Sequence, residues 1–96
     1  MTKTMTIWTV WETEEEYYEW RKFQKVSNTL EDIAYIECGD VRYDLEYDYE
    51  DGRTNMYYSE KDENGDFETV DEYVDNGFAH APTLADFIQK LVEEIL

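Results

Sequence analysis

The clearest pattern in this chain is a strict alternation of apolar and charged residues over residues 41–50. One set of positions holds Val41, Tyr43, Leu45, Tyr47 and Tyr49. The positions between them hold Arg42, Asp44, Glu46, Asp48 and Glu50. Because successive side chains of a β-strand point to opposite faces, the pattern predicts a strand with one buried and one solvated face. The three tyrosines are then expected in the core, with their hydroxyls at the surface.

Turn signals on both sides of this strand predict a meander. Residues 38–40, Cys-Gly-Asp, predict a tight reversal before it, and Asp51-Gly52 predicts a hairpin turn after it. A second hairpin turn is predicted at Asn64-Gly65, after a strand through residues 54–58. The apolar residues between positions 67 and 74 are compatible either with a returning strand or with a short helix.

Strands are also predicted nearer the two ends of the chain. Met5–Trp11 has apolar residues on both of its faces, which is typical of a covered strand. Residues 29–36 combine turn-forming and strand-forming residues and predict a turn that runs into a strand. Asn76-Gly77 predicts a further turn, followed by a short strand at Phe78–Ala81.

Two amphipathic segments predict helices. Thr13 is placed to cap the first, over residues 14–25, which begins with three glutamates and ends with three bases, as the helix dipole favours. Its apolar side is formed by Trp20, Phe23 and Val26, with Tyr17 at the edge. The second helix follows Pro82, with Thr83 as its cap. Its apolar stripe, which must lie on the sheet, consists of Leu84, Phe87, Ile88, Leu91, Val92 and Ile95.

These elements predict a single acidic α+β domain over residues 1–96. Its expected architecture is an antiparallel β-meander of about four to five strands, with an N-terminal and a C-terminal helix packed on it. A chain of 96 residues suits one domain. Three tryptophans, nine tyrosines and four phenylalanines supply large side chains for a small core, so a folded chain is expected.

Charge changes this picture, because the net charge is −17 at pH 7. Residues 40–75 hold 14 acidic and 3 basic residues, so the excess is concentrated in the predicted hairpins. Such a charge destabilises the compact state and repels DNA, RNA and anionic membranes. We therefore expect a monomer or homodimer that binds a basic protein, with no direct binding to nucleic acid or membrane. A halophile's ordinary binding domain is an alternative, although it should spread its carboxylates evenly.

Candidate chemistry is sparse. No phosphate-binding glycine loop, Gly-x-Ser-x-Gly elbow or His-Glu-x-x-His motif is present, so we predict neither an enzyme nor a cofactor. His80 is the only histidine, and Asp62, Asn64 and Asp66 match the start of a calcium-binding loop whose sixth position is not glycine, so no metal site is predicted. Cys38 is expected to be buried. One cysteine, no signal peptide and no membrane span predict a cytoplasmic protein.

The candidate binding surface is the charged face of residues 41–50. Its carboxylates stand roughly 7 Å apart along the strand, close to the phosphate spacing of a nucleic-acid strand, so the row predicts a fit to a groove lined with Lys and Arg. The neighbouring hairpin is expected to widen the row into a patch, with Tyr57 or Tyr58 facing out. The predicted partner-binding residues are Asp44, Glu46, Asp48, Glu50, Asp51, Tyr57, Glu60, Asp62, Glu63, Asp66, Glu68, Asp71 and Glu72. A solvated face that only prevents aggregation is the alternative.

In size, charge and tyrosine-rich acidic strands, the chain resembles the small inhibitors encoded by phages and mobile elements, the anti-CRISPR and anti-restriction proteins. The resemblance is one of class and rests on no family motif. It implies a protein of the host bacterial cytoplasm that imitates nucleic acid and occupies the channel of an effector such as a Cas nuclease. An immunity protein that neutralises a basic nuclease toxin is the alternative function.

Overall fold

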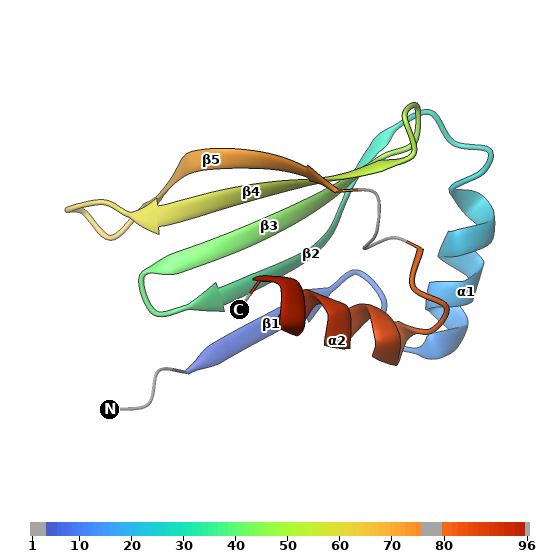
Figure 1. The fold of residues 1–96 in the computed structure, drawn as a ribbon, viewed down its shortest axis with the longest axis horizontal. Helices are drawn as coiled ribbons and strands as arrows, with labels where there is room; N and C mark the ends of the chain where they lie inside the picture. Colours follow the sequence, from blue (N-terminus) through green and yellow to red (C-terminus); the bar gives the residue numbers. More distant parts are fainter. Residues whose placement is uncertain (1–3, 76–79, 96) are drawn as a thin grey trace.

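Five antiparallel strands form a meander in the order β1-β2-β3-β4-β5, with a helix after the first strand and another after the last (Figure 1). The computed structural model describes residues 4–75 and 80–95. The elements are β1 (Met5–Thr9), α1 (Glu14–Phe23), β2 (Leu30–Cys38), β3 (Val41–Asp48), β4 (Arg53–Lys61), β5 (Phe67–Asp75) and α2 (Leu84–Ile95). The α+β architecture predicted from the sequence is confirmed.

Glycines make the three turns between neighbouring strands of the meander. Gly39, Gly52 and Gly65 all have positive φ angles, of 62°, 66° and 85°. Residues with a Cβ rarely adopt this backbone conformation, which explains why glycine occupies these positions. The three predicted turns are confirmed. The stretch between positions 67 and 74, which allowed a strand or a helix, forms β5.

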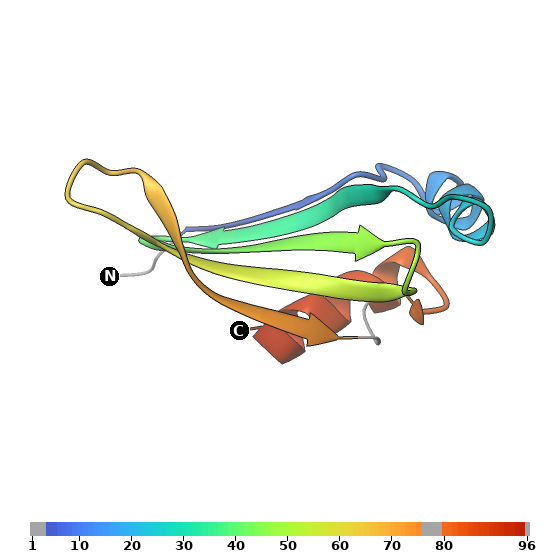
Figure 2. The same ribbon diagram turned by 90° about the horizontal axis from the view of Figure 1, so that it is seen from above.

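Both helices pack on the same face of the sheet. In Figures 1 and 2, α2 runs along this face and α1 stands at one end of the sheet, beside the β3–β4 turn. Neither helix covers the opposite face, which we call the outer face. The prediction of a covered first strand is therefore wrong, because β1 is an edge strand whose Trp8 remains 41% exposed on the outer face.

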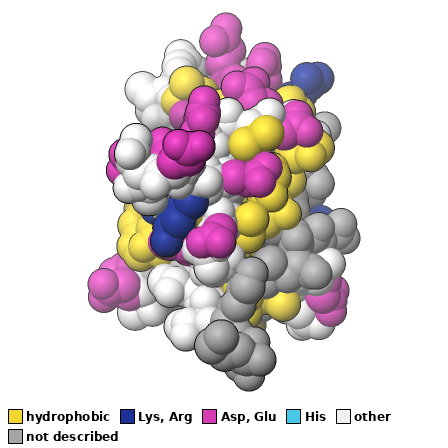
Figure 3. Space-filling model, turned by 90° about the vertical axis from the view of Figure 1, so that its left-hand side faces the viewer, with side chains coloured by type: hydrophobic (Ala, Val, Ile, Leu, Met, Phe, Trp, Pro, Cys, Tyr) yellow, Lys and Arg dark blue, Asp and Glu magenta, His cyan; other side chains and the backbone are white. Residues whose placement is uncertain are grey.

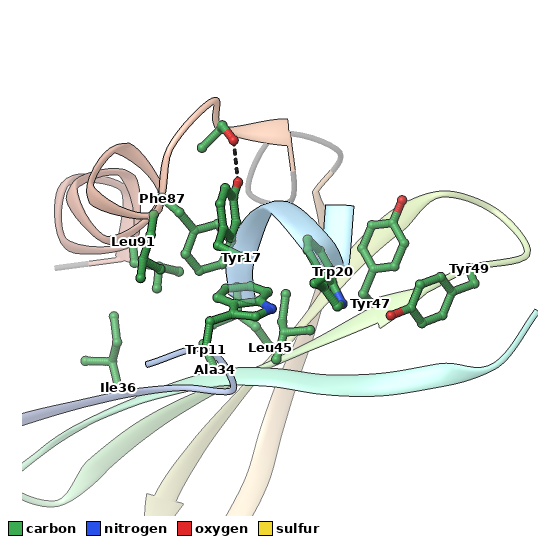
Figure 4. Packing of buried hydrophobic residues seen from close by; sticks show 13 residues of the cluster. Trp11, Tyr17, Trp20, Ala34, Ile36, Leu45, Tyr47, Tyr49, Phe87 and Leu91 are labelled. Carbon is green, nitrogen blue, oxygen red and sulfur yellow. Dashed lines mark hydrogen bonds between the residues drawn. The ribbon is translucent and has the colours of Figure 1, made fainter. Parts of the chain in front are cut away.

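Aromatic rings make the core between the helices and the sheet (Figure 4). Trp11 follows β1, and its ring centroid lies 4.9 Å from that of Tyr17, 4.7 Å from that of Trp20 and 5.0 Å from that of Phe87. Such tilted and edge-to-face contacts are the favoured packing of aromatic pairs. Leu45 and other buried residues of the sheet lie beneath this cluster. Trp11 therefore joins β1, α1 and α2 at one point.

Helix caps also tie the two helices together. The hydroxyl of Thr13 accepts a hydrogen bond from the Glu16 backbone N–H at 3.2 Å, and Thr83 caps α2 in the same way. The carboxylate of Glu14 accepts hydrogen bonds from the N–H groups of Leu84 and Ala85, at 2.9 and 3.2 Å. A residue in the first turn of α1 thus satisfies the first free N–H groups of α2.

The buried side of α1 differs from the prediction. Tyr17, expected at the edge, is fully buried beside Trp20, whereas Phe23 and Val26 are 55% and 79% exposed. Steps of three residues rotate around a helix, so the four positions cannot all face one surface. The helix also ends at Phe23 rather than at residue 25.

The strand ends depart from the predictions as well. β2 begins at Leu30, and a bulge between Asp32 and Ala34 replaces the predicted turn. β3 ends at Asp48, two residues early, because the Asp48 carboxylate accepts hydrogen bonds from the Glu50 and Asp51 N–H groups and starts the turn. The strand predicted at Phe78–Ala81 begins outside the described residues, and its last two residues are not in a strand.

Removing the ring of Phe87 tests the aromatic cluster. Phe87 is fully buried against Trp11. We expect Phe87→Ala to lower the free energy of unfolding by about 3–5 kcal/mol. The matched variant Phe23→Ala, at a position 55% exposed, should cost far less. Urea unfolding followed by tryptophan fluorescence measures both, and equal losses would contradict the packing described here.

Tyr17 makes the free energy of unfolding depend on pH in the alkaline range. Its hydroxyl donates a hydrogen bond to the Ala81 carbonyl, and burial raises its pKa from 10.0 to about 12. The unfolded chain ionises this phenol at lower pH than the folded chain, so the stabilisation is complete below pH 10 and is lost as pH rises towards 12. Tyr17→Phe should therefore show a shallower fall in unfolding free energy between these pH values. An unchanged slope in pH-dependent urea unfolding would contradict this assignment.

Candidate functional site

A row of side chains crosses all five strands on the outer face. The pairing register aligns Trp8, Tyr35, Asp44, Tyr57 and Glu72, one from each strand in order. The rings of Trp8 and Tyr35 stack, with centroids 5.5 Å apart and planes 13° apart. The outer face thus has an aromatic centre as well as carboxylates.

Arg42 is held over this aromatic centre. Its guanidinium carbon lies 3.9 Å from the centroid of the Tyr35 ring, so Tyr35 is in contact with both Trp8 and Arg42. The guanidinium also pairs with Asp44 at 3.0 Å and, more distantly, with Glu37 at 3.9 Å. These contacts offset the charge of Arg42 within the chain.

The predicted carboxylate row of β3 does lie on the outer face, but its members have internal partners. Asp44 pairs with Arg42, and Asp48 accepts the turn hydrogen bonds described above. Glu46 accepts a hydrogen bond from the hydroxyl of Tyr57 at 3.2 Å. Burial, followed by the negative charge of Glu46, raises the pKa of Tyr57. All three acids are only partly exposed, so the row is less free than the sequence pattern indicated.

Glu50 and Asp51 lie in the β3–β4 turn, at the opposite end of β4 from Glu60 and Asp62. Glu50 and Asp51 both line a hollow of about 820 Å³. Three bases of α1 and the residues just after it also line this hollow: Arg21, Lys22 and Lys25. Because acids and bases line it together, it presents no single sign of charge. The predicted surface therefore does not extend to Glu50 and Asp51 as one field.

The remaining predicted acids lie on a hairpin arm, which we define as residues 60–72 of the β4–β5 hairpin. The arm projects past both helices (Figures 1 and 2), and all of its residues except Phe67 are exposed. Asp62 and Asp71 accept hydrogen bonds from residues of the arm, and Asp71 also accepts one from the neighbouring Tyr73 hydroxyl. Within residues 4–75 and 80–95, no ion pair or hydrogen bond engages the carboxylates of Glu60, Glu63, Asp66, Glu68 and Glu72.

Two of these acids directly oppose each other. A bulge at Val70 shifts the register of β5, so that Glu68 rather than Thr69 faces Glu60 across the ladder. Directly opposed residues have Cβ atoms about 5 Å apart, and like charges there are destabilising. Lys61, the one cation of the arm, lies over the Phe67 ring at 5.4 Å instead of pairing with either glutamate. The arm therefore carries an unrelieved repulsion.

The acids of the arm do not merge with the β3 row into one flat patch. Glu72 belongs to the outer face, whereas Asp71 is in register with Tyr58 and Tyr43, on the face used by the helices. Figure 3 looks at the arm end of the molecule and shows acidic side chains spread across it, with hydrophobic side chains between them. The predicted sheet-sized patch on a single face is thus replaced by an arm that is acidic on both faces.

The structure adds no metal chemistry to this surface. The Asp62 carboxylate accepts hydrogen bonds from the N–H groups of Asn64 and Asp66, at 2.8 and 3.0 Å, and so closes the hairpin turn. In the described part of the chain, no group of three or more His, Cys, Asp or Glu residues is arranged to hold a metal ion. Cys38 is a free thiol and is half-buried rather than buried. None of the described helices is both long and apolar enough to span a membrane.

Sequence reasoning missed the aromatic centre of the outer face. The sequence pattern places Trp8 in a covered strand and Arg42 on the charged face of residues 41–50, with no contact between them. Both belong to one cluster because β1 pairs with β2 in a register that sets Trp8 opposite Tyr35.

Arg42 offers a test of the outer-face contacts. We expect Arg42→Gln to lower the free energy of unfolding by about 1 kcal/mol, since its ion pairs are partly exposed and screened by solvent. Arg53→Gln removes the same charge from an exposed position of β4 that makes no ion pair with any described residue, and should cost less than about 0.5 kcal/mol. Urea unfolding at low ionic strength compares them, and equal values would contradict the role of Arg42.

The candidate site consists of two surfaces. One is the outer face with its aromatic centre, and the other is the hairpin arm with its unpaired carboxylates. No protein-family model, curated protein or solved structure matches this chain.

Proposed function

We propose that this protein binds a basic nucleic-acid-handling protein, such as a Cas effector or another nuclease, and inhibits it by occupying the groove that holds nucleic acid. The observation that carries the proposal is the opposition of Glu60 and Glu68, neither of which forms an ion pair with any described residue. A sequence selected for folding alone gains nothing from this repulsion. A partner that supplies Lys or Arg between the two glutamates relieves it.

The field of the whole protein favours the same kind of partner. A net charge of −17 attracts cationic surfaces over long distances and accelerates association with them. Grooves that hold nucleic acid are lined with Lys and Arg, and they bind largely through phosphate charge. The carboxylates of the arm provide negative charge without a nucleic-acid backbone.

The shape of the arm suits a groove better than a flat surface. Its two strands project past the helices and carry acids on both faces. Side chains on one face of a strand repeat roughly every 7 Å, close to the spacing of phosphates along a nucleic-acid strand. An arm of this kind meets both walls of a groove, as a duplex does.

Charge reversal in the arm tests this function. The double variant Glu60→Lys with Glu68→Lys makes the net charge four units more positive. Both positions are exposed, so the contacts between the helices and the core are unchanged. We expect its capture of basic proteins from a bacterial lysate to fall about tenfold or more. Glu60→Lys alone replaces the repulsion by an opposite-charge pair, so it should raise the free energy of unfolding by about 0.2–1 kcal/mol while weakening capture.

The matched control is Glu15→Lys with Glu19→Lys, which makes the same change in net charge on the exposed surface of α1. It should retain capture within about threefold, and wild-type capture should weaken steeply as salt rises. Equal losses in the two double variants would show that only total charge matters. Unchanged capture by the arm variant would overturn the arm as the binding surface.

A further inference from the structure

A hollow of about 430 Å³ opens on the outer face, and Thr69 at the base of the arm also lines it. Its lining combines aromatic rings with acids: Trp8, Tyr35, Tyr57, Asp32 and Asp44. Arg42 also lines it, but that guanidinium is already engaged by Tyr35 and Asp44. Trp8, at 41% exposed, is a large ring left open to solvent.

Aromatic faces and carboxylates together recognise one chemical group, a cation with a flat or apolar body. A guanidinium stacks on an aromatic ring and is bound by carboxylates in the plane of its N–H groups. The chain shows this geometry itself, since Arg42 lies over Tyr35 while it pairs with Asp44. Trp8 extends the same stack by one exposed ring.

We propose that this hollow receives an arginine side chain of a partner protein, stacked on Trp8 and paired with the carboxylates of Asp32 or Asp44. Charge selects this occupant. A second copy of the chain also carries a net charge of −17, so it would be repelled by this acidic face. An anionic ligand would be repelled in the same way. Asp32 also opposes Glu46 in the register of β2 and β3, so a further cation there relieves a second like-charge pair.

The inference rests on the proposed basic partner but adds a preference that charge alone does not give. Lys and Arg carry equal charge, and only Arg presents a planar group that stacks and pairs at the same time. The hairpin arm, which is built mainly of carboxylates, should distinguish the two cations weakly. The outer hollow should distinguish them through Trp8.

The experiment compares octa-arginine and octa-lysine as probes of the intact protein. Affinities are measured by isothermal titration, and the indole N–H signal of Trp8 is followed by NMR. We expect octa-arginine to bind at least about threefold more tightly than octa-lysine, and to shift the Trp8 signal. In Trp8→Leu, which keeps an apolar side chain but removes the ring, this ratio should fall to about one.

Tyr18→Ala is the matched control, because Tyr18 is 43% exposed on α1 and does not line the hollow. It should keep the wild-type ratio, and circular dichroism checks that both variants fold. A ratio near one in the wild type, or an unchanged ratio in Trp8→Leu, would overturn the arginine site. Salt-sensitive binding of both peptides in that case would leave the arm proposal standing, whereas no binding of either peptide would contradict both.

Discussion

The packing of three aromatic rings around Trp11 is the interaction on which the rest of the molecule depends. Trp11 contacts rings from both helices just after the first strand, so one residue fixes α1 and α2 on the same face of the sheet. The Glu14 carboxylate reinforces the junction through the N-terminus of α2. Because both helices pack on that face, no helix covers the outer face or the far end of the β4–β5 hairpin.

This division separates stability from recognition. The aromatic core lies near the helices, whereas the hairpin arm is held by backbone pairing between its own two strands and, at Glu60, with Val41 of β3. On the outer face, by contrast, Arg42 offsets the acids of β3 and holds an aromatic stack. The proposed partner therefore meets an arm that supplies charge and a face that supplies both charge and rings.

The sequence predicted the features that depend on neighbouring residues and missed those set by long-range pairing. Alternation in β3, the glycine turns and the stripe of α2 from Leu84 to Val92 are local patterns, and the structure confirms them together with the α+β class. The exposed Phe23, the uncovered β1 and the contact of Arg42 with the Tyr35 ring depend on which elements pack against each other. The sequence predicts the acids of the arm, but the opposition of Glu68 to Glu60 follows from the bulge at Val70, which no local pattern marks.

The central claim is that the hairpin arm takes the place of nucleic acid in a basic groove, and competition tests it most directly. A basic protein captured by the immobilised chain at low salt is challenged with increasing concentrations of duplex DNA. The account predicts that DNA releases the captured protein in proportion to its own binding, because both occupy one groove. Stable retention of a partner that binds DNA at the same time would contradict it.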